Sequence, residues 1–287
     1  MKNLWITGAG GFLGVRAAAY YAGKYNVTAL GHGALDIADE DAVRRLFDGA
    51  RDKPDYLLHC AAVSDTGYAE RHPGESAAIN LRGPQNIARA CAAYGVKLVY
   101  MSSDQVYSAC TEQAPLPEDA PAAPQNVYGR DKLAAERAVR TLLPGAVGLR
   151  LSWLYDLPQS GYTPNRGLLL HLTQAAAAGK TVQAAVQEHR GVTDVWAVVE
   201  RLERCFALPG GVYNFGSPNA HNSYETFLYA ARCLALPAPE TWILPDEARF
   251  AASPRNLAMN MDRLSGVGIT FADTWAGFAG AIRRKNA

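Results

Sequence analysis

The sequence of 287 residues predicts an α/β fold, in which a doubly wound parallel sheet is followed by a smaller C-terminal lobe. Three observations lead to this fold class. Short apolar segments alternate with amphipathic ones through the first half, which is the pattern of βαβ units. A glycine-rich turn follows the first apolar segment, and after Trp153 the alternation gives way to a region rich in proline and glycine. We therefore expect a first domain over residues 1–155, to which later segments return, and a substrate lobe over residues 156–287.

The elements of the first domain follow from their hydrophobic pattern. Apolar runs suited to a buried parallel sheet predict strands at residues 3–7, 27–30, 56–60, 97–102 and 146–151. Helical periodicity between them predicts helices at residues 12–23, 40–50, 75–94 and 128–142. Crossovers between parallel strands are right-handed, so the sheet should be wound on both faces.

Proline and glycine mark the remaining boundaries. Residues 114–124 contain four prolines, which exclude a helix or a central strand and lead the chain directly to Asn126. In the second lobe we expect helices at residues 168–178, 194–208 and 224–236 and a strand at 212–215. Ligands of such folds bind at the carboxyl edge of the sheet, and the second lobe is expected to pack over that edge.

Composition argues against several classes of partner. The net charge is +1 and like charges do not cluster, which argues against a nucleic-acid or anionic-membrane surface. Apolar stretches are too short to span a membrane, and the N-terminus does not resemble a signal peptide. The five cysteines are scattered without a C-x-x-C pair, which predicts reduced thiols in a cytoplasmic protein and no metal site.

The turn T-G-A-G-G-F-L-G places Gly8, Gly11 and Gly14 between the first strand and the first helix. Glycines allow a tight turn and a close approach of the backbone to a pyrophosphate, which the N-terminus of the following helix then faces. The strict G-x-G-x-x-G pattern is not met, because Leu13 occupies its last position. The position of the turn nevertheless favours dinucleotide binding over a plain turn, and so a Rossmann-like domain.

The end of the second strand bears on the choice of cofactor. NAD-binding chains usually have an acidic residue there for the ribose hydroxyls, but this sequence reads L-G-H-G. His32 and Arg16 are the nearby candidates for a 2′-phosphate, which favours NADP(H) over NAD(H); the alternative is a surface histidine and a solvated arginine. Asp36 is placed to accept a hydrogen bond from the adenine amine, or instead to cap the helix near Glu40.

A second cluster of polar residues has the chemistry of a carbonyl reductase. Tyr128 and Lys132 are four residues apart, so they share one face of the predicted helix, and Ser103 follows a central strand. Reduction of a ketone by hydride leaves an alkoxide, which a phenol can protonate. A neighbouring ammonium would lower the phenol pKa, and a serine hydroxyl would hold the carbonyl oxygen. Taken alone, Ser102 and Ser103 could equally be turn residues.

These motifs together resemble the extended short-chain dehydrogenase/reductases, and within them the dTDP-4-dehydrorhamnose reductase family of dTDP-rhamnose biosynthesis. The matching pieces are T-G-A-G-G-F-L-G, H-C-A-A, I-N, S-S-D-Q-V-Y, N-V-Y-G-R-D-K-L-A-A-E, R-L-S-W-L-Y and, more faintly, P-R-N-L-A-M-N-M-D-R-L. The resemblance implies a reductase of a 4-keto nucleotide sugar, acting as a monomer or homodimer, with a small-molecule substrate as its partner.

The resemblance also assigns residues to roles. Catalysis is expected from Ser103, Tyr128 and Lys132. Contacts to the cofactor are expected from Gly8, Gly11, Phe12, Leu13, Arg16, His32, Asp36, Ile37, Ala61, Ala62, Ser102, Tyr128 and Lys132. Contacts to the substrate are expected from Ser64, Ser103, Gln105, Tyr128, Trp153, Asn165 and Arg190. Trp153 could equally be a core aromatic, and an arginine in a loop is often only solvated.

Departures from the family pattern leave alternatives open. Thr66–Tyr68, Gln105 and Arg190–Thr193 differ from the usual residues, and each lies on the substrate side. A 4,6-dehydratase would need an acid–base pair where this chain has Asp104 and Gln105, and an amide cannot exchange a proton in that way. A nucleotide-sugar epimerase remains an alternative. So does a non-catalytic NADP-binding regulatory subunit, as in the methionine adenosyltransferase β subunit.

Overall fold

The computed structural model describes residues 1–112, 115–157, 162 and 167–286. The chain divides into two compact units that interleave along the sequence. The first comprises Met1–Val106, Ala123–Arg150 and Val199–Tyr213, and the second Tyr107–Ala122, Leu151–Val198 and Asn214–Ala287. A late segment therefore returns to the first unit, while residues 107–122 group with the second.

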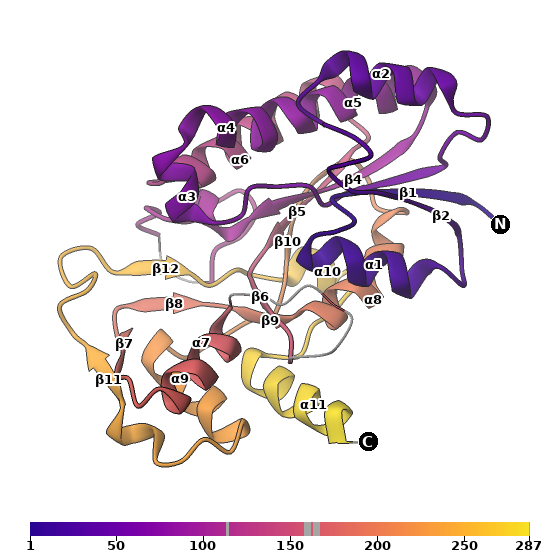
Figure 1. Ribbon diagram of the computed structural model, residues 1–287. Helices are drawn as coiled ribbons and strands as arrows, with labels where there is room; N and C mark the ends of the chain where they lie inside the picture. The colour runs from indigo at the N-terminus through magenta and orange to yellow at the C-terminus, as the bar shows by residue number, and fades with distance from the viewer. Residues whose placement is uncertain (113–114, 158–161, 163–166, 287) are drawn as a thin grey trace. The chain divides into compact units, whose positions relative to one another are not determined.

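The first unit is built on a six-stranded sheet with the order β10-β5-β4-β3-β1-β2 (Figure 1). The strands are β1 (Asn3–Thr7), β2 (Asn26–Leu30), β3 (Tyr56–His59), β4 (Lys97–Ser103), β5 (Val147–Leu151) and β10 (Gly211–Phe215). β1 pairs in parallel with β2 on one side and β3 on the other, and β3 pairs in parallel with β4. The strand order thus reverses between β1 and β3, which confirms the doubly wound sheet and puts its topological switch point there.

Helices cover both faces of this sheet. Figure 1 shows α2 (Glu40–Gly49), α5 (Gly83–Tyr94) and α6 (Val127–Leu142) on one face and α1 (Phe12–Tyr21) on the other. Trp5, Phe47 and Leu57 belong to the buried cluster that joins strands to helices on the first of these faces. On the second, the Tyr21 hydroxyl donates a 2.5 Å hydrogen bond to the Val199 carbonyl.

The largest departure from the predicted elements concerns residues 66–94. One helix was expected over residues 75–94, but the segment forms α3 (Thr66–Arg71), α4 (Pro73–Ala77), a π-helical turn (Ala78–Arg82) and then α5. Pro73 at the first position of α4 starts a new helix, because it needs no amide partner there. The wider π-helical turn lets Asn80 reach back to the chain after β3, where it bonds both the amide and the carbonyl of Val63.

The second unit contains the expected helices and several short strands. The helices are α7 (Leu168–Ala177), α8 (Val195–Cys205), which continues into the first unit, α9 (Ser223–Cys233), α10 (Asp262–Ser265) and α11 (Thr274–Asn286), with a 3₁₀ turn at Pro239–Thr241. The strands are β6 (Trp153–Tyr155), β7 (Val182–Ala185), β8 (Glu188–Arg190), β9 (Val192–Asp194), β11 (Ile243–Asp246) and β12 (Arg255–Leu257). They pair in parallel as β6–β9, β7–β11 and β8–β12.

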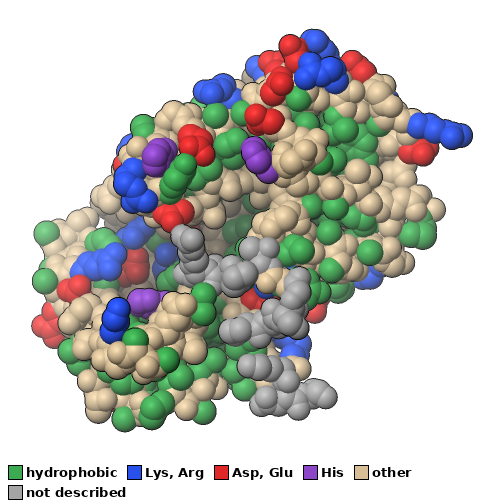
Figure 2. All heavy atoms as spheres, in the orientation of Figure 1, with side chains coloured by type: hydrophobic (Ala, Val, Ile, Leu, Met, Phe, Trp, Pro, Cys, Tyr) green, Lys and Arg blue, Asp and Glu red, His purple; other side chains and the backbone are tan. Residues whose placement is uncertain are grey.

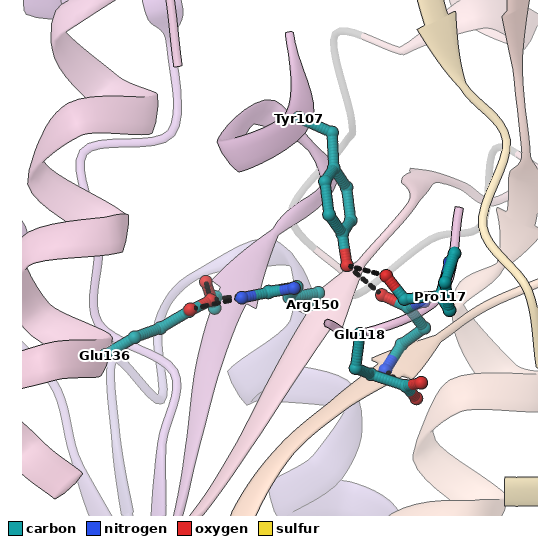
Figure 3. A network of polar contacts seen from close by, with 7 residues as sticks. Tyr107, Pro117, Glu118, Glu136 and Arg150 are labelled. Atoms are coloured by element: carbon teal, nitrogen blue, oxygen red, sulfur yellow. Dashed lines mark hydrogen bonds and ion pairs between the residues drawn. The ribbon is translucent and has the colours of Figure 1, made fainter. Parts of the chain in front are cut away.

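The proline-rich segment is held by tertiary contacts of the second unit. The Tyr107 hydroxyl, at the end of the 3₁₀ turn Asp104–Tyr107, lies 3.1 Å from the Pro117 carbonyl and 3.0 Å from the Asn214 side-chain oxygen (Figure 3). The Asn214 amide donates to the Glu118 carboxylate at 3.0 Å. Its described residues, 115–124, form no helix or strand, so these contacts to residues far along the chain define their path.

Charged side chains of both signs are interspersed on the face shown in Figure 2, most visibly over α2. Arg44 lies 2.9 Å from Asp41, and Arg45 lies 3.6 Å from Asp39.

Among the described residues, no helix combines the length and the apolar character needed to cross a membrane.

Candidate active site

The glycine turn lies at the switch point of the sheet. Gly8 follows β1 directly and has φ +68°, a left-handed conformation that favours glycine. A Cβ at Gly8 would lie 2.5 Å from the Ala61 amide nitrogen, so the turn packs against the backbone that follows β3. A Cβ at Gly14 would collide with the Gly8 carbonyl. The three-residue spacing of the glycines is therefore needed for the close approach of strand, turn and helix.

A buried histidine lies beneath this turn. The Thr7 hydroxyl and the His59 Nδ1 atom, at the adjacent ends of β1 and β3, are 2.7 Å apart and buried. Burial, with a smaller effect from the Lys132 charge, lowers the pKa of His59 to about 3, so its ring is neutral. The His59 Nε2 atom is buried and has no partner among the described residues. Sequence reasoning treated His59 only as part of a family motif.

The N-terminus of α6 is fixed by a side-chain cap. The Asn126 side-chain oxygen accepts from the Gly129 amide at 2.7 Å, and its amide donates to the Gln105 side chain at 2.9 Å. Because a Cβ at Gly129 would lie 2.6 Å from the Gln105 carbonyl, glycine is what permits this approach. Gln105, expected near the substrate, is itself buried between Asn126 and Asp104.

Ser103, Tyr128 and Lys132 are brought together by β4 and α6. The Ser103 side chain interacts with the Tyr128 hydroxyl and acts to lower its pKa, and the Ser103 hydroxyl donates to Asp104 at 3.1 Å. The Lys132 ammonium lies 5.6 Å from the centre of the Tyr128 ring and donates to the Met101 carbonyl at 3.0 Å. The structure thus assembles the three residues, all of them buried, on which the sequence-based mechanism depends.

The pKa values of this group differ from the sequence-based expectation. Burial raises the pKa of Tyr128 above its usual range; the interaction with Ser103 opposes this and the nearby Asp104 charge adds to it. The pKa of Tyr128 is therefore raised, and not lowered, in the protein alone, because desolvation of the phenolate is the largest effect. Burial also lowers the pKa of Lys132 to about 8, against the opposing effect of nearby Cys60, Asp131 and Glu136, of which the two carboxylates carry negative charge.

The residues near the end of β2 have distinct environments. His32 and Asp36 are exposed, whereas Ile37 is buried. Asp36 accepts from the Ala38 amide at 2.9 Å, and the cap of α2 is Asp39, so the suggestion that Asp36 caps this helix is wrong.

Arg16 is buried, so the alternative of a solvated arginine is wrong. Its guanidinium donates to the Phe12 carbonyl at 2.7 Å, its central carbon lies 4.3 Å from the centre of the Phe12 ring, and the side chain is buried. Among the other residues expected at the cofactor, Leu13 and Ser102 are buried, Phe12 and Ala61 are half-buried, and Gly11 and Ala62 are exposed.

The residues expected at the substrate are distributed over both units. Ser64 is exposed in the first unit. In the second, the Arg190 guanidinium lies 5.0 Å from the centre of the Trp153 ring, which in turn contacts Phe227. Arg190 thus stacks on Trp153 and is not merely solvated. Asn165 lies outside the described residues.

The fold and this site together define a Rossmann-like chain of the extended short-chain dehydrogenase/reductase type. The chain belongs to the family described as RmlD substrate binding domain, whose model matches residues 1–205. Two relatives are named dTDP-4-dehydrorhamnose reductase. One from Mycolicibacterium smegmatis is 41% identical over 54% of this chain and 46% of its own length, and one from Streptomyces griseus is 31% identical over 94% and 89%.

Two further comparisons extend along most of the chain. The methionine adenosyltransferase 2 subunit beta of Xenopus laevis is 30% identical over 93% of this chain and 83% of its own length. The crystal structure of a dTDP-4-dehydrorhamnose reductase from Bacillus anthracis in complex with NADP has a TM-score of 0.85, with 23% identity over 99% of both chains. That likeness confirms the fold. The chain spans about half the length of the first curated relatives it matches.

Among the described residues, no group of three or more His, Cys, Asp or Glu side chains could hold a metal ion.

Proposed function

We propose that this protein reduces the ketone of a 4-keto nucleotide sugar with NADPH, and that Tyr128 donates the proton. Family membership and the names of the relatives support the substrate class. The observation that carries the proposal is the buried group on β4 and α6, in which Tyr128 interacts with Ser103 and lies one turn from Lys132, whose ammonium is 5.6 Å from the centre of the Tyr128 ring. These are the residue types that carbonyl reduction requires, in contact with one another.

The turn after β1 fits a dinucleotide. Gly8, Gly11, Phe12 and Leu13 would hold the pyrophosphate at the N-terminus of α1, where amide hydrogens and the helix dipole favour an anion. Ala61 and Ala62 would line the cofactor beyond β3, with Ile37 near its adenine and Ser102 beneath its nicotinamide half. When bound, the cofactor supplies a hydride to the carbonyl carbon of the substrate.

The residues of the chain then control the proton. Ser103 holds the carbonyl oxygen beside the Tyr128 hydroxyl, and Tyr128 transfers its proton to that oxygen as negative charge develops there. The raised pKa of Tyr128 keeps the hydroxyl protonated until that moment. The Lys132 ammonium favours the resulting phenolate, so its charge matters most after proton transfer.

The preference for NADPH is a separate part of the proposal. His32 is exposed at the end of β2, where it can meet a 2′-phosphate, and the nearby Asp36 carboxylate is engaged by the Ala38 amide. Buried Arg16 would have to leave Phe12 to take part. His32→Ala should therefore weaken NADPH binding more than NADH binding, as titrated by nucleotide fluorescence. Equal losses for the two nucleotides would refute this preference.

The test of the function is cofactor oxidation with a panel of dTDP-, UDP-, GDP- and CDP-linked 4-keto sugars. The proposal predicts NADPH consumption with at least one of them and reduction at C4 of the sugar. The similarity to a methionine adenosyltransferase β subunit favours a second candidate, a cofactor-binding regulatory subunit. Tight NADPH binding without turnover of any sugar would reject the reductase and favour that candidate.

A further inference from the structure

Three successive residues of β4 interact with three residues spaced one turn apart on α6, and two of the three pairs are hydrogen-bonded. The Met101 carbonyl accepts from Lys132, the Ser102 hydroxyl donates to Glu136 at 2.5 Å, and the Ser103 side chain interacts with the Tyr128 hydroxyl. The α6 residues share one helix face because they are four apart. This set of contacts fixes how α6 lies along β4, and two of the three α6 residues are the proposed proton donor and its cation.

Glu136 is the member of this set with no direct part in the proposed reaction. Its carboxylate accepts two hydrogen bonds from Arg150 of β5, at 3.0 Å and 2.7 Å, in addition to the bond from Ser102 (Figure 3). Glu136 and Arg150 are 4% and 5% exposed. Both carboxylate oxygens are therefore engaged, and the paired planar groups permit little variation in geometry.

A buried ion pair of this kind is better explained by positioning than by stability. Removing two charges from water costs about as much free energy as their attraction returns, so apolar residues would stabilise the core as well or better. What the pair supplies is a fixed direction: Arg150 orients the carboxylate, which then meets Ser102 at a single register of α6. A shift of α6 along β4 would break this bond together with that of Lys132 to Met101, and it would move Tyr128 relative to Ser103.

We propose that Glu136 is a positioning residue, held by Arg150, which sets the register of α6 on β4 and so aligns Tyr128 and Lys132 with Ser103. This proposal rests on the proposed function for the roles of those three residues. The charged and titratable groups that face the Lys132 ammonium are Glu136, Asp131, Cys60, the neutral His59 and Tyr128.

The test uses two variants of Glu136 and a control in the full-length protein. Glu136→Gln removes the charge and the bidentate pair. Glu136→Asp keeps the charge, but its shorter side chain cannot span both Arg150 and Ser102. The control is Phe47→Leu on α2, a buried residue whose ring contacts Trp5 and Tyr94 and which takes no part in the hydrogen bonds between β4 and α6. The readouts are kcat, KM and the Lys132 Cε resonance in ¹³C-lysine-labelled protein, assigned with Lys132→Arg.

The positioning role predicts a loss in kcat of about 10²-fold for Glu136→Gln and at least about 10-fold for Glu136→Asp, without a matching rise in KM. The Lys132 resonance should move in both variants, and the pKa of Lys132 should fall only in Glu136→Gln. Phe47→Leu should change none of these readouts. The proposal is overturned if folded Glu136→Asp keeps wild-type kcat and an unmoved Lys132 resonance, or if Phe47→Leu produces the same changes.

The two proposals can fail separately. If the wild-type protein reduces none of the sugars, the proposed function is rejected, but the Lys132 resonance, which needs no substrate, still decides whether Glu136 sets the register. If Glu136→Gln does not fold, the kcat and the Lys132 resonance of the milder Glu136→Asp variant test the proposal in its place.

Discussion

The Lys132 ammonium nitrogen lies 5.6 Å from the centre of the Tyr128 ring, and burial shifts the pKa values of the two residues in opposite directions. The pKa of Tyr128 is raised and that of Lys132 is lowered, because the buried site disfavours both charged forms. Near neutral pH the tyrosine therefore keeps its proton, while the lysine is close to its titration point. Both features lead to measurable consequences.

Reduction should slow as pH rises through about 8. The protonated form of Lys132 is the one that favours the phenolate left by proton transfer, and its pKa is about 8. Above that value the ammonium is lost while Tyr128, with its raised pKa, remains neutral. A profile of kcat/KM between about pH 6 and about pH 10 should show one descending limb near 8. A rate that stays level beyond about pH 9.5 would contradict this role of Lys132.

Lys132→Met should stabilise the protein at neutral pH although it abolishes reduction. The folded pKa of about 8 lies below the unfolded value near ~10.4, so folding disfavours the ammonium. This penalty is fully present below about pH 8 and disappears as pH rises through ~10.4, and it amounts to at most about 3 kcal/mol. In urea unfolding, the free energy by which the variant exceeds the wild-type protein should be smaller above pH ~10.4 than below about pH 8. A constant difference would argue against a lowered pKa.

His59 should make the protein sensitive to mild acid. Its folded pKa of about 3 lies far below the unfolded value near ~6.5, so the unfolded chain binds an additional proton between these values. Below pH ~6.5 the His59 group should therefore lower the free energy of unfolding by about 1.4 kcal/mol for each pH unit of acidification. The slope for His59→Gln should be shallower by that amount in denaturant melts at stepped pH. Parallel curves for the two proteins would count against the assignment.

Gly8→Ala should weaken NADPH binding and lower stability by about 1–3 kcal/mol. Gly8 has φ +68°, and an added Cβ would meet the Ala61 backbone at 2.5 Å. Gly10→Ala in the same turn is the matched control, because a Cβ there would meet no described atom within 4 Å. Calorimetric titration with NADPH and thermal melts should separate the two variants. Similar behaviour of both would mean that the close packing of the turn is unimportant.

The sequence predicted best what depends on local patterns. The strands around β1 were predicted from apolar runs, and the start of α6 from the N-V-Y-G segment, where Asn126 caps the helix. β8 and β12 have three residues each and pair across a long interval of sequence, so neither has a hydrophobic period of its own. Such strands exist only through tertiary contact.

The candidate site likewise combines features that local sequence predicts with features that depend on tertiary contacts. Spacing along the helix predicted that Tyr128 and Lys132 share a face, but it contains no information on burial, which decides the direction in which the pKa of Tyr128 shifts. The bonds of Glu136 to Ser102 and Arg150 join three separate elements, so no local pattern predicts them. In the sequence, Glu136 is recognisable only as the last residue of the N-V-Y-G-R-D-K-L-A-A-E motif.

The most direct test of the proposed function is single-turnover oxidation of NADPH by Tyr128→Phe with a 4-keto nucleotide sugar that the wild-type protein reduces. The substitution removes only the hydroxyl, so NADPH binding should be retained. The rate of the chemical step should fall by about 10²-fold to 10⁴-fold, because the alkoxide loses its proton donor. A Tyr128→Phe protein that binds NADPH and reduces the sugar at the wild-type rate would contradict the assignment of Tyr128 as the acid.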